Sequence, residues 1–284
     1  MTAETKSASC QPRTAIRKPH NKQTMRAILG IDLQNDFVLR QGALSVAGAE
    51  EDARRISEFI RRNRRNIHHI SLTLDSHHPL HIAHPIYWKD RDGNHPSPFT
   101  VITPQDIEEG KWVSEINPEW SRHYVIELNK QGERLTIWNK HCILGTSGWA
   151  IASPVVNACI EWEEATGRPY QLWYKGSNRF TEHYSVFKAA LTYPDAPETE
   201  LNVPLIETLD QYDEIYICGE AMNYCCLNSI KDLNAYAPHL MKKVVILEDC
   251  MSSIGDFDIH TDAVYQEAIR LGGRILKSTD IVMP

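Results

Sequence analysis

Short apolar runs alternate with amphipathic segments along most of the chain. The runs have the length and composition of buried strands, and they lie at residues 26–31, 69–74, 170–174, 214–218, 243–247 and 274–277. Helices are predicted between them, at residues 50–63, 153–167, 182–191, 225–236 and 260–271. This order predicts an α/β fold, a three-layer αβα sandwich with a mainly parallel, doubly wound sheet. Ligands of such sheets bind at the carboxyl ends of the strands.

Residues 85–137 interrupt this alternation. They are rich in Pro, Gly, Asn and Trp and contain one clear strand candidate, at residues 124–128. We therefore expect one folded domain over residues 25–284, with a long insertion at about 85–137. The polar residues 1–24 are expected to form a disordered N-terminal tail, and a transit peptide is the alternative.

Charge and composition exclude several classes of partner. The formal net charge is −7, so the chain has no basic surplus with which to neutralise the phosphates of a nucleic acid. No apolar stretch approaches the roughly 20 residues that span a bilayer, so no membrane partner is expected. The seven cysteines are odd in number and several lie in strand-like runs, which is typical of free thiols in a reducing compartment. We therefore expect a cytoplasmic protein.

Polar side chains follow the first two predicted strands. Asp32 ends the first apolar run, and a buried carboxylate is unfavourable unless it is paired. Either Asp32 serves a site, or Asp32 or Asp36 caps the following loop. A dense group of potential metal ligands follows the second strand, namely Asp75, His77, His78, His81 and His84. Such a group suits zinc, iron or manganese, and a histidine-rich surface loop is the alternative.

Three further positions carry potential chemistry. His141 can supply a metal ligand from a distant part of the chain, although a lone His-Cys pair also fits ordinary packing. Lys175 follows an apolar strand, so its side chain can enter a site at the strand end. Cys225 lies at a predicted strand-to-helix turn, where the helix dipole and a nearby ammonium would lower the pKa of its thiol. A buried packing role is the alternative for this cysteine.

Five motifs occur in order along the chain. They are Asp-Leu-Gln-Asn-Asp-Phe at 32–37, Asp-x-His at 75–77, Trp-x-x-His-Cys-x-x-Gly-Thr-x-Gly at 138–148, Tyr-Lys-Gly at 174–176 and Gly-x-Ala-x-x-x-Cys at 219–225. This series resembles the isochorismatase-like cysteine hydrolases and, within them, most of all the nicotinamidases (pyrazinamidases). The resemblance extends from about residue 26 to residue 280.

The resemblance implies a role for each matching residue. It places the catalytic aspartate, lysine and nucleophile at Asp32, Lys175 and Cys225. It places the ligands of a divalent metal ion, which would be zinc, iron or manganese, at Asp75, His77 and His141. A further ligand would be His81 or His84, and we favour His84.

The resemblance also implies the surroundings of the nucleophile. It predicts a cis peptide bond between Glu220 and Ala221, and an oxyanion hole formed by the backbone N–H groups of Ala221 and Cys225. It makes Phe37 and Trp138 the aromatic residues that hold a pyridine ring.

The implied activity is a metal-dependent hydrolysis of nicotinamide to nicotinate and ammonia through a thioester on Cys225. The expected partners are therefore a small-molecule amide and, as in many members of the family, a second copy of the chain in a homo-oligomer. The alternative is a related hydrolase that acts on another small amide, carbamoyl or ureido substrate. Metal-free ether hydrolysis of the isochorismatase type is disfavoured by Asp75, His77 and His141.

Two other functions are disfavoured, and three features depart from the family pattern. A non-catalytic metal-binding scaffold is disfavoured by the intact catalytic residues, and redox sensing by Cys225 and Cys226 is disfavoured because adjacent cysteines rarely form an unstrained disulfide. The departures are Asn139 in place of a proline, Asn223 in place of Asp, Ser or Thr, and the length of residues 85–137. The length of residues 85–137 bears on the substrate more than on the chemistry.

Overall fold

The computed structural model describes residues 23–283, and its centre is a six-stranded sheet in which every strand pairing is parallel. The strands lie in the spatial order β5-β2-β1-β6-β7-β8. Their bounds are Arg26–Ile31 (β1), His69–Asp75 (β2), Gln171–Lys175 (β5), Glu214–Gly219 (β6), Val244–Leu247 (β7) and Arg274–Leu276 (β8). Each corresponds to a predicted apolar run, so the expected parallel sheet is confirmed.

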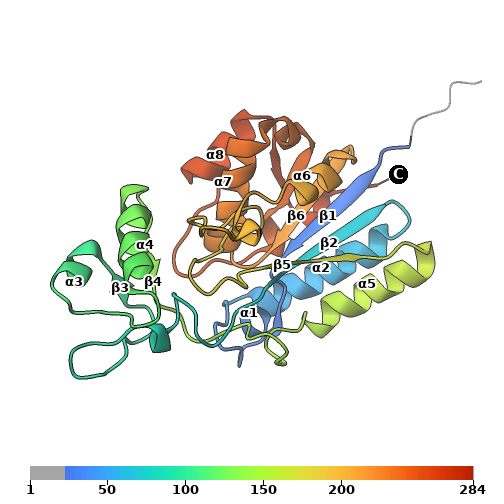
Figure 1. Ribbon diagram of the computed structural model, residues 1–284. Coiled ribbons are helices and arrows are strands. Elements are labelled where there is room, and N and C mark those ends of the chain that lie inside the picture. Colours follow the sequence, from blue (N-terminus) through green and yellow to red (C-terminus); the bar gives the residue numbers. More distant parts are fainter. Residues whose placement is uncertain (1–22, 284) are drawn as a thin grey trace, which may run out of the picture.

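Helices cover both faces of this sheet (Figure 1). On one face lie α2 (Ala49–Asn63) and α5 (Ser153–Thr166), which pack against each other. On the other face lie α6 (Val203–Asp210), α7 (Leu227–Tyr236) and α8 (Ala263–Arg270). The predicted three-layer αβα sandwich is therefore confirmed.

The two hydrophobic cores follow from the alternation of side chains along each strand. In β1, Ile28 packs into the core on the α2 side, whereas Ala27, Leu29 and Ile31 pack into the core on the α7 side. Because both faces are covered, β1 is buried throughout, and all of its residues after Arg26 are apolar. Burial of one such aliphatic side chain stabilises the fold by about 1.5–3 kcal/mol.

The order of the strands defines where a ligand can bind. From β1 the chain proceeds through β2 to β5 on one side, and it later returns to β6 on the other side of β1 before it continues outward. This reversal is a topological switch point, and ligands of doubly wound sheets bind outside the carboxyl ends of the strands at such a point. The carboxyl ends of β1 and β6 are therefore the expected centre of a site.

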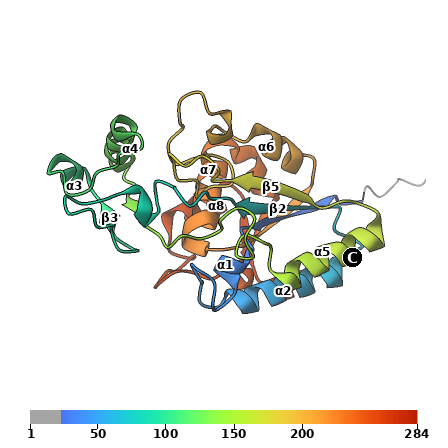
Figure 2. The ribbon, with the colours of Figure 1, turned by 60° about the horizontal axis from the view of Figure 1, so that its bottom comes forward.

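Residues 85–137 form a group of small elements on one side of the central sheet (Figures 1 and 2). They are η1 (Pro85–Tyr87), β3 (Val101–Ile102), α3 (Pro104–Glu108), α4 (Pro118–Lys130) and β4 (Leu135–Thr136), and β3 pairs with β4 in antiparallel orientation. The proposed domain bounds and the reading of this segment as an insertion stay predictions. The N-terminal tail lies almost wholly outside the described residues.

The predicted strand at residues 124–128 is wrong, because these residues lie within α4. The side chain of Asn117 accepts a hydrogen bond from the backbone of Trp120, and Pro118 occupies the first turn, so the helix has a strong start. Tyr124, Val125 and Leu128 are buried on one face. A short apolar run fits either a strand or the buried face of a helix, and the cap before it decides between them.

The predicted helix at residues 182–191 is also wrong, because this segment is irregular and buried. Its backbone forms hydrogen bonds outside a helix, for example from Val186 N–H to the Ser229 hydroxyl at 3.0 Å and from Ala190 N–H to the Glu182 carbonyl at 2.8 Å. The helix α5 begins at Ser153, the first residue of the predicted range, and its N-cap is Ala152.

The remaining short helices connect the main elements. They are α1 (Asn35–Val38), η2 (Pro197–Thr199), η3 (Met222–Cys226), η4 (Pro238–Lys243), η5 (Glu248–Cys250) and η6 (Ser278–Asp280). Among the helices described between residues 23 and 283, none has the length and apolar character needed to cross a bilayer.

Candidate active site

Asp32 lies directly after β1, with a backbone φ of 49°, and its side chain is fully buried. The hydroxyl of Thr73 donates a hydrogen bond to Asp32 Oδ1 at 2.6 Å and accepts one from the Asp32 backbone at 3.0 Å. Asp32 Oδ2 lies 2.8 Å from Lys175 Nζ. The carboxylate is thus held from the neighbouring strand and paired with a cation, so it is not a loop cap.

Lys175 is the last residue of β5, and its ammonium group contacts several polar groups. Its Nζ lies 2.8 Å from Asp32 Oδ2, 3.2 Å from Asp75 Oδ1 and 3.7 Å from Cys225 Sγ. It also donates a hydrogen bond to the carbonyl of His183 at 2.7 Å. Burial disfavours the charged form, but the Asp32 and Asp75 carboxylates outweigh it and raise the pKa of Lys175 well above its usual value. The two carboxylates therefore favour the charged form of Lys175.

Cys225 lies in η3, the single turn of π-helix that precedes α7, and its side chain is buried. Burial raises the pKa of the Cys225 thiol well above its ordinary value, and the charge on Lys175 offsets only part of that rise. The Asp32 carboxylate raises it further. The predicted lowering of this pKa is therefore wrong for the resting protein, in which Cys225 is a thiol next to a carboxylate.

The turn before Cys225 has an unusual backbone. The peptide bond between Glu220 and Ala221 is cis, as the family resemblance predicts. Gly219 has a φ of +131°, and a Cβ added there would lie 2.0 Å from the carbonyl oxygen of Ile31. Only glycine fits here, which explains the first position of the Gly-x-Ala-x-x-x-Cys motif. The backbone N–H of Ala221 donates no hydrogen bond to the residues that the structure describes.

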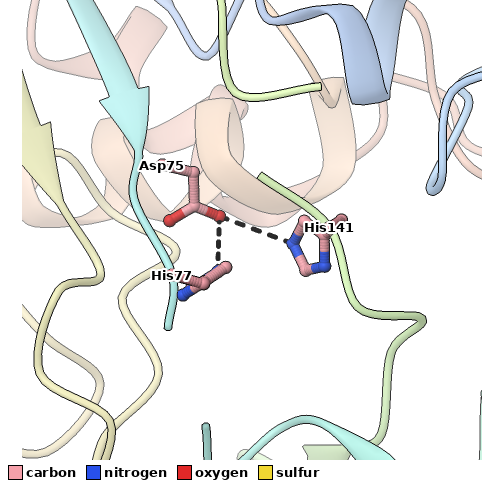
Figure 3. Close-up of side chains that lie close together, drawn as sticks. All are labelled: Asp75, His77 and His141. Atoms are coloured by element: carbon pink, nitrogen blue, oxygen red, sulfur yellow. Dashed lines mark ion pairs between the residues drawn. The ribbon is translucent and has the colours of Figure 1, made fainter. Parts of the chain in front are cut away.

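A cluster of potential metal ligands lies beside this group, at the end of β2. Asp75, His77 and His141 are buried, and their ligand atoms lie within 4.8 Å of one another. Figure 3 shows both imidazole rings directed toward the Asp75 carboxylate. Asp75 Oδ2 lies 2.9 Å from His77 Nε2 and 3.6 Å from His141 Nε2. Burial would raise the pKa of Asp75, but His77 and Lys175 hold it well below its usual value.

Backbone carbonyls fix both imidazole rings in an orientation that suits metal binding. His77 Nδ1 lies 3.0 Å from the carbonyl oxygen of Gly176, and His141 Nδ1 lies 2.8 Å from that of Asn139. With a metal ion bound, a proton on each Nδ1 would satisfy these contacts and leave each Nε2 with a lone pair for the metal. Metal-binding histidines commonly have such an outer hydrogen bond. Among the described residues, His77 Nε2 has only the Asp75 carboxylate beside it, at 2.9 Å, and Asp75 Oδ1 has only the Lys175 ammonium, at 3.2 Å. The residues therefore fit a divalent transition-metal ion.

His81 and His84, the two candidates for a further metal ligand, differ in whether a ring nitrogen is available to bind a metal ion. Both ring nitrogens of His81 are engaged, because Nδ1 accepts a hydrogen bond from Ala83 N–H and Nε2 lies 3.1 Å from the Thr181 carbonyl. His84 Nδ1 contacts the Pro79 carbonyl, whereas His84 Nε2 is buried without a partner in the described part of the chain. The ring of His84 lies 5.4 Å from that of His77 and 5.5 Å from that of His141.

A narrow cavity of about 30 Å³ connects the two groups of residues. Its wall is mainly aromatic and aliphatic, and it includes Asp75, His141 and Cys225. The predicted aromatic residues Phe37 and Trp138 both line it. The other lining residues are Leu44, Glu182, Tyr184, Ala221, Tyr224 and Ile254.

Glu182 was missed by the sequence reasoning. It is buried, its Oε2 has no partner among the described residues, and it lies in one group with His77 and His81 whose ligand atoms are within 4.8 Å. Burial raises the pKa of the Glu182 carboxyl, although the charge of His77 opposes this. Nothing in the local pattern indicates this role, because Glu182 lies in the segment that was predicted to be a helix.

Several motif residues support the site without lining it. Gln34 Nε2 donates to the Asp75 carbonyl at 2.8 Å, and Gln34 Oε1 accepts from the Asp75 N–H at 2.7 Å, so one amide fixes the end of β2. The Asp36 carboxylate accepts hydrogen bonds from the backbones of Ala43 and Cys142, so for Asp36 the loop-capping alternative is correct.

Gly176 completes the Tyr-Lys-Gly motif for a steric reason. Its φ is +75°, and an added Cβ would lie 2.5 Å from Asp75 Oδ1 and 2.9 Å from Cε1 of His77. A side chain at this position would therefore displace the metal-ligand cluster.

Comparisons with known proteins agree with this geometry. No family model matches the chain. The nicotinamidase of Saccharomyces cerevisiae is 25% identical over 232 residues, which cover 82% of this chain and 90% of that protein. The crystal structure of the yeast nicotinamidase bound to the inhibitor nicotinaldehyde matches with a TM-score of 0.62 and 20% identity, over 89% of this chain and 100% of that one.

Two prokaryotic structures give the same result. A nicotinamidase/pyrazinamidase of Acinetobacter baumanii matches with a TM-score of 0.58 and 20% identity, over 92% of this chain and 100% of that one. A Pyrococcus horikoshii pyrazinamidase in complex with zinc matches with a TM-score of 0.50 and 17% identity, over 89% of this chain and 98% of that one. The chain thus shares the isochorismatase-like fold of these enzymes, and its resemblance to nicotinamidases is confirmed.

Proposed function

We propose that this protein is a metal-dependent cysteine amidohydrolase that converts nicotinamide to nicotinate and ammonia. The observation that carries the proposal is that Asp32 and Lys175, at the ends of β1 and β5, lie beside Cys225, which lines the cavity. Lys175 Nζ lies 2.8 Å from Asp32 Oδ2 and 3.7 Å from Cys225 Sγ. The sequence similarity to the yeast nicotinamidase supports the same reaction.

In the first half of the reaction, Asp32 accepts the thiol proton of Cys225. Burial raises the pKa of the Asp32 carboxyl, and a carboxylate of raised pKa is a stronger base toward the thiol. Lys175 stabilises the resulting thiolate, which attacks the amide carbonyl carbon. The backbone N–H groups of Ala221 and Cys225 are proposed to bind the oxyanion, and one such donor is typically worth about 2.7–4 kcal/mol. The C–N bond then breaks, and Asp32 returns its proton to the departing ammonia.

In the second half, a water molecule hydrolyses the thioester. Asp32 is again a carboxylate after ammonia has left, so it can take a proton from the attacking water. The C–S bond breaks, the Cys225 sulfur recovers the proton, and nicotinate leaves. Phe37 and Trp138 would hold the ring, because both line the cavity and the Trp138 ring lies 5.1 Å from that of Tyr224.

Asp75, His77 and His141 would hold a divalent metal ion, with His84 or Glu182 as a further ligand. When bound there, the ion supplies a positive charge that orients the ring nitrogen of the substrate or a water molecule. A zinc complex of a pyrazinamidase with this fold supports zinc as the first ion to test. Iron and manganese also fit the donor set. A homo-oligomer stays a prediction.

The proposal is tested by the release of ammonia from nicotinamide. The purified, zinc-loaded protein should release it, whereas a Cys225→Ala variant and a chelator-treated sample should not. Cys226→Ala is the matched control, because Cys226 is buried beside Cys225 but does not line the cavity. If the loaded wild-type protein releases no ammonia, nicotinamide is not the substrate, and other small amide, carbamoyl and ureido compounds should be screened.

A further inference from the structure

One buried carboxyl group lies next to the proposed oxyanion site and has no part in the mechanism above. Glu220 connects the end of β6 to Ala221, and its side chain is 0% exposed. Its backbone N–H donates to the Ile31 carbonyl at 2.9 Å. Its Oε2 accepts a hydrogen bond from the backbone of Ser252 at 3.2 Å, while the Ser252 carbonyl accepts one from Met222 N–H at 2.8 Å. Ser252 therefore contacts the turn on both sides of Ala221.

Ser252 also contacts a second buried carboxyl group, that of Asp52, so the Glu220 and Asp52 carboxyl groups contact the same residue. Asp52 lies in the first turn of α2 and is 1% exposed. Its Oδ1 lies 2.6 Å from Arg55 Nη2, and its Oδ2 accepts a hydrogen bond from the Ser252 hydroxyl. An anion at this position is also favoured by the helix dipole. Of the two carboxyl groups, Asp52 is therefore the one with the partners that an ionised carboxylate needs.

Glu220 lacks such partners. Its Oε1 is buried without a hydrogen-bond donor in the described part of the chain. A second negative charge here would face Asp52 in a water-free environment, whereas a proton on Glu220 turns the same contact into a hydrogen bond donated to Asp52. The other ionisable groups nearby are Arg55 of α2, Cys218 of β6 and Cys226 of η3, and only Arg55 is cationic. Burial and Asp52 together raise the pKa of Glu220 well above its ordinary value.

We propose that Glu220 is a positioning residue that stays neutral, donates a hydrogen bond to Asp52, and so anchors the Ala221–Cys225 turn to helix α2. The turn is also held by backbone contacts to Ile31 and Ser252, by the Tyr265 hydroxyl, which donates to the Met222 carbonyl at 2.7 Å, and by two hydrogen bonds between Asn223 and Ile254. The effect on turnover rests on the proposed function, because Ala221 and Cys225 act in that mechanism. The protonation state of Glu220 does not rest on it.

The protonation state is tested by thermal unfolding of wild-type protein and Glu220→Gln between pH 5 and pH 9. The folded protein retains a proton that the unfolded chain loses above the ordinary glutamate pKa, so wild-type stability falls as the pH rises toward the raised pKa. Glu220→Gln keeps a neutral donor and lacks this titration. The wild-type Tm should therefore fall relative to the variant by roughly 3–5 °C per pH unit. Glu207→Gln, an exposed site on α6, is the control for loss of charge.

Parallel Tm curves for wild type and Glu220→Gln would overturn the neutral state, whether or not nicotinamide is hydrolysed. The positioning role is tested by kinetics at pH 7. Glu220→Ala should lower kcat by up to about 100-fold with little change in KM, as expected for a misplaced reacting group, and Glu220→Gln should restore most of the rate. If wild-type protein is active and Glu220→Ala is equally active, the positioning role is wrong. If wild-type protein is itself inactive, the proposed function has failed. The Tm comparison then still tests whether Glu220 is protonated in the folded protein.

Discussion

The site has a catalytic half, formed by Asp32, Lys175 and Cys225, and a metal half, formed by Asp75, His77 and His141. The two halves differ in whether their charged and polar side chains are paired with one another. In the catalytic half, the Lys175 ammonium lies against Asp32 and Cys225, so a buried cation and a buried anion are paired within the protein. In the metal half, two imidazole nitrogens approach one oxygen of Asp75, and backbone carbonyls fix both rings. The first arrangement is complete with protein atoms alone, and the second is arranged to receive a cation.

This difference shows which half is tied to folding and which to ligand binding. A buried ion pair stabilises a fold only while both partners are present, and removal of one partner leaves an uncompensated charge. A ligand cluster contributes to stability mainly through the ion that it binds. Variants in the catalytic half should therefore affect chemistry and folding, and variants in the metal half should affect the response to metal.

The largest effect is expected for Cys225→Ala, which removes the nucleophile. Ammonia release should fall on the order of 10⁴-fold or more, as for other covalent catalysts that lose a member of the catalytic group. Metal content, measured by mass spectrometry, should stay at the wild-type value, because Cys225 is not among the metal-ligand residues. Full turnover by a variant of verified mass would show that another residue is the nucleophile.

The next largest effect is expected for Lys175→Met, which removes the buried cation between Asp32 and Asp75. The remaining carboxylates lose their counter-charge, so the free energy of unfolding should fall by about 3–5 kcal/mol. Urea unfolding measures this change, and activity should be lost with it. Lys277→Met, at an exposed position, is the control and should change stability by no more than about 0.5 kcal/mol. Equal stability of the two variants would contradict the pairing.

A smaller effect, the stabilisation of the folded protein by zinc, should depend on the metal half of the site and not on the catalytic half. Zinc at 100 times its Kd should raise the free energy of unfolding by about 2.7 kcal/mol in wild-type protein and equally in Cys225→Ala. His141→Ala should lose most of this gain, because it removes one of the three proposed ligands. Thermal unfolding with zinc and with a chelator measures both. An undiminished zinc response in His141→Ala would remove this residue from the ligand set.

The smallest effect concerns acid stability of the catalytic half. Burial and the charge of Lys175 lower the pKa of His183 to about 3, so folded His183 stays neutral where the unfolded chain binds a proton. Stability is therefore lost as the pH falls below about 6.5, by up to roughly 1.4 kcal/mol for the first pH unit. His183→Gln should flatten this decline in urea unfolding at pH 6.5 and 5.5. An identical decline in both proteins would show that folded His183 titrates normally.

The four inner strands of the sheet could be predicted from the sequence because they are buried along nearly their whole length. All residues of β1 after Arg26 are apolar, so this strand can be recognised from its own sequence. The strand predicted at residues 124–128 is wrong because this apolar run forms the buried face of α4. The helix predicted at residues 182–191 is wrong because side chains and non-helical backbone contacts provide the hydrogen bonds of this segment.

The site was predictable to the extent that its residues follow strands. Asp32, Asp75 and Lys175 do so, and the structure brings them together. The environment of each group could not be predicted, because it depends on tertiary contacts. The thiol of Cys225 was expected to have a lowered pKa from its place at a helix start, but burial reverses the direction. Glu182 reaches the cavity from an irregular segment with no local signature.

Three consecutive positions at the end of β5 differ in their freedom to vary during evolution. Tyr174 is 58% exposed and can accept many side chains. Lys175 is restricted by charge, because two carboxylates depend on its ammonium. Gly176 is restricted by its φ of +75° and by space, since one added carbon would meet Asp75 and His77. While the metal cluster is retained, we therefore expect evolution to change Tyr174 often, Lys175 rarely and Gly176 never.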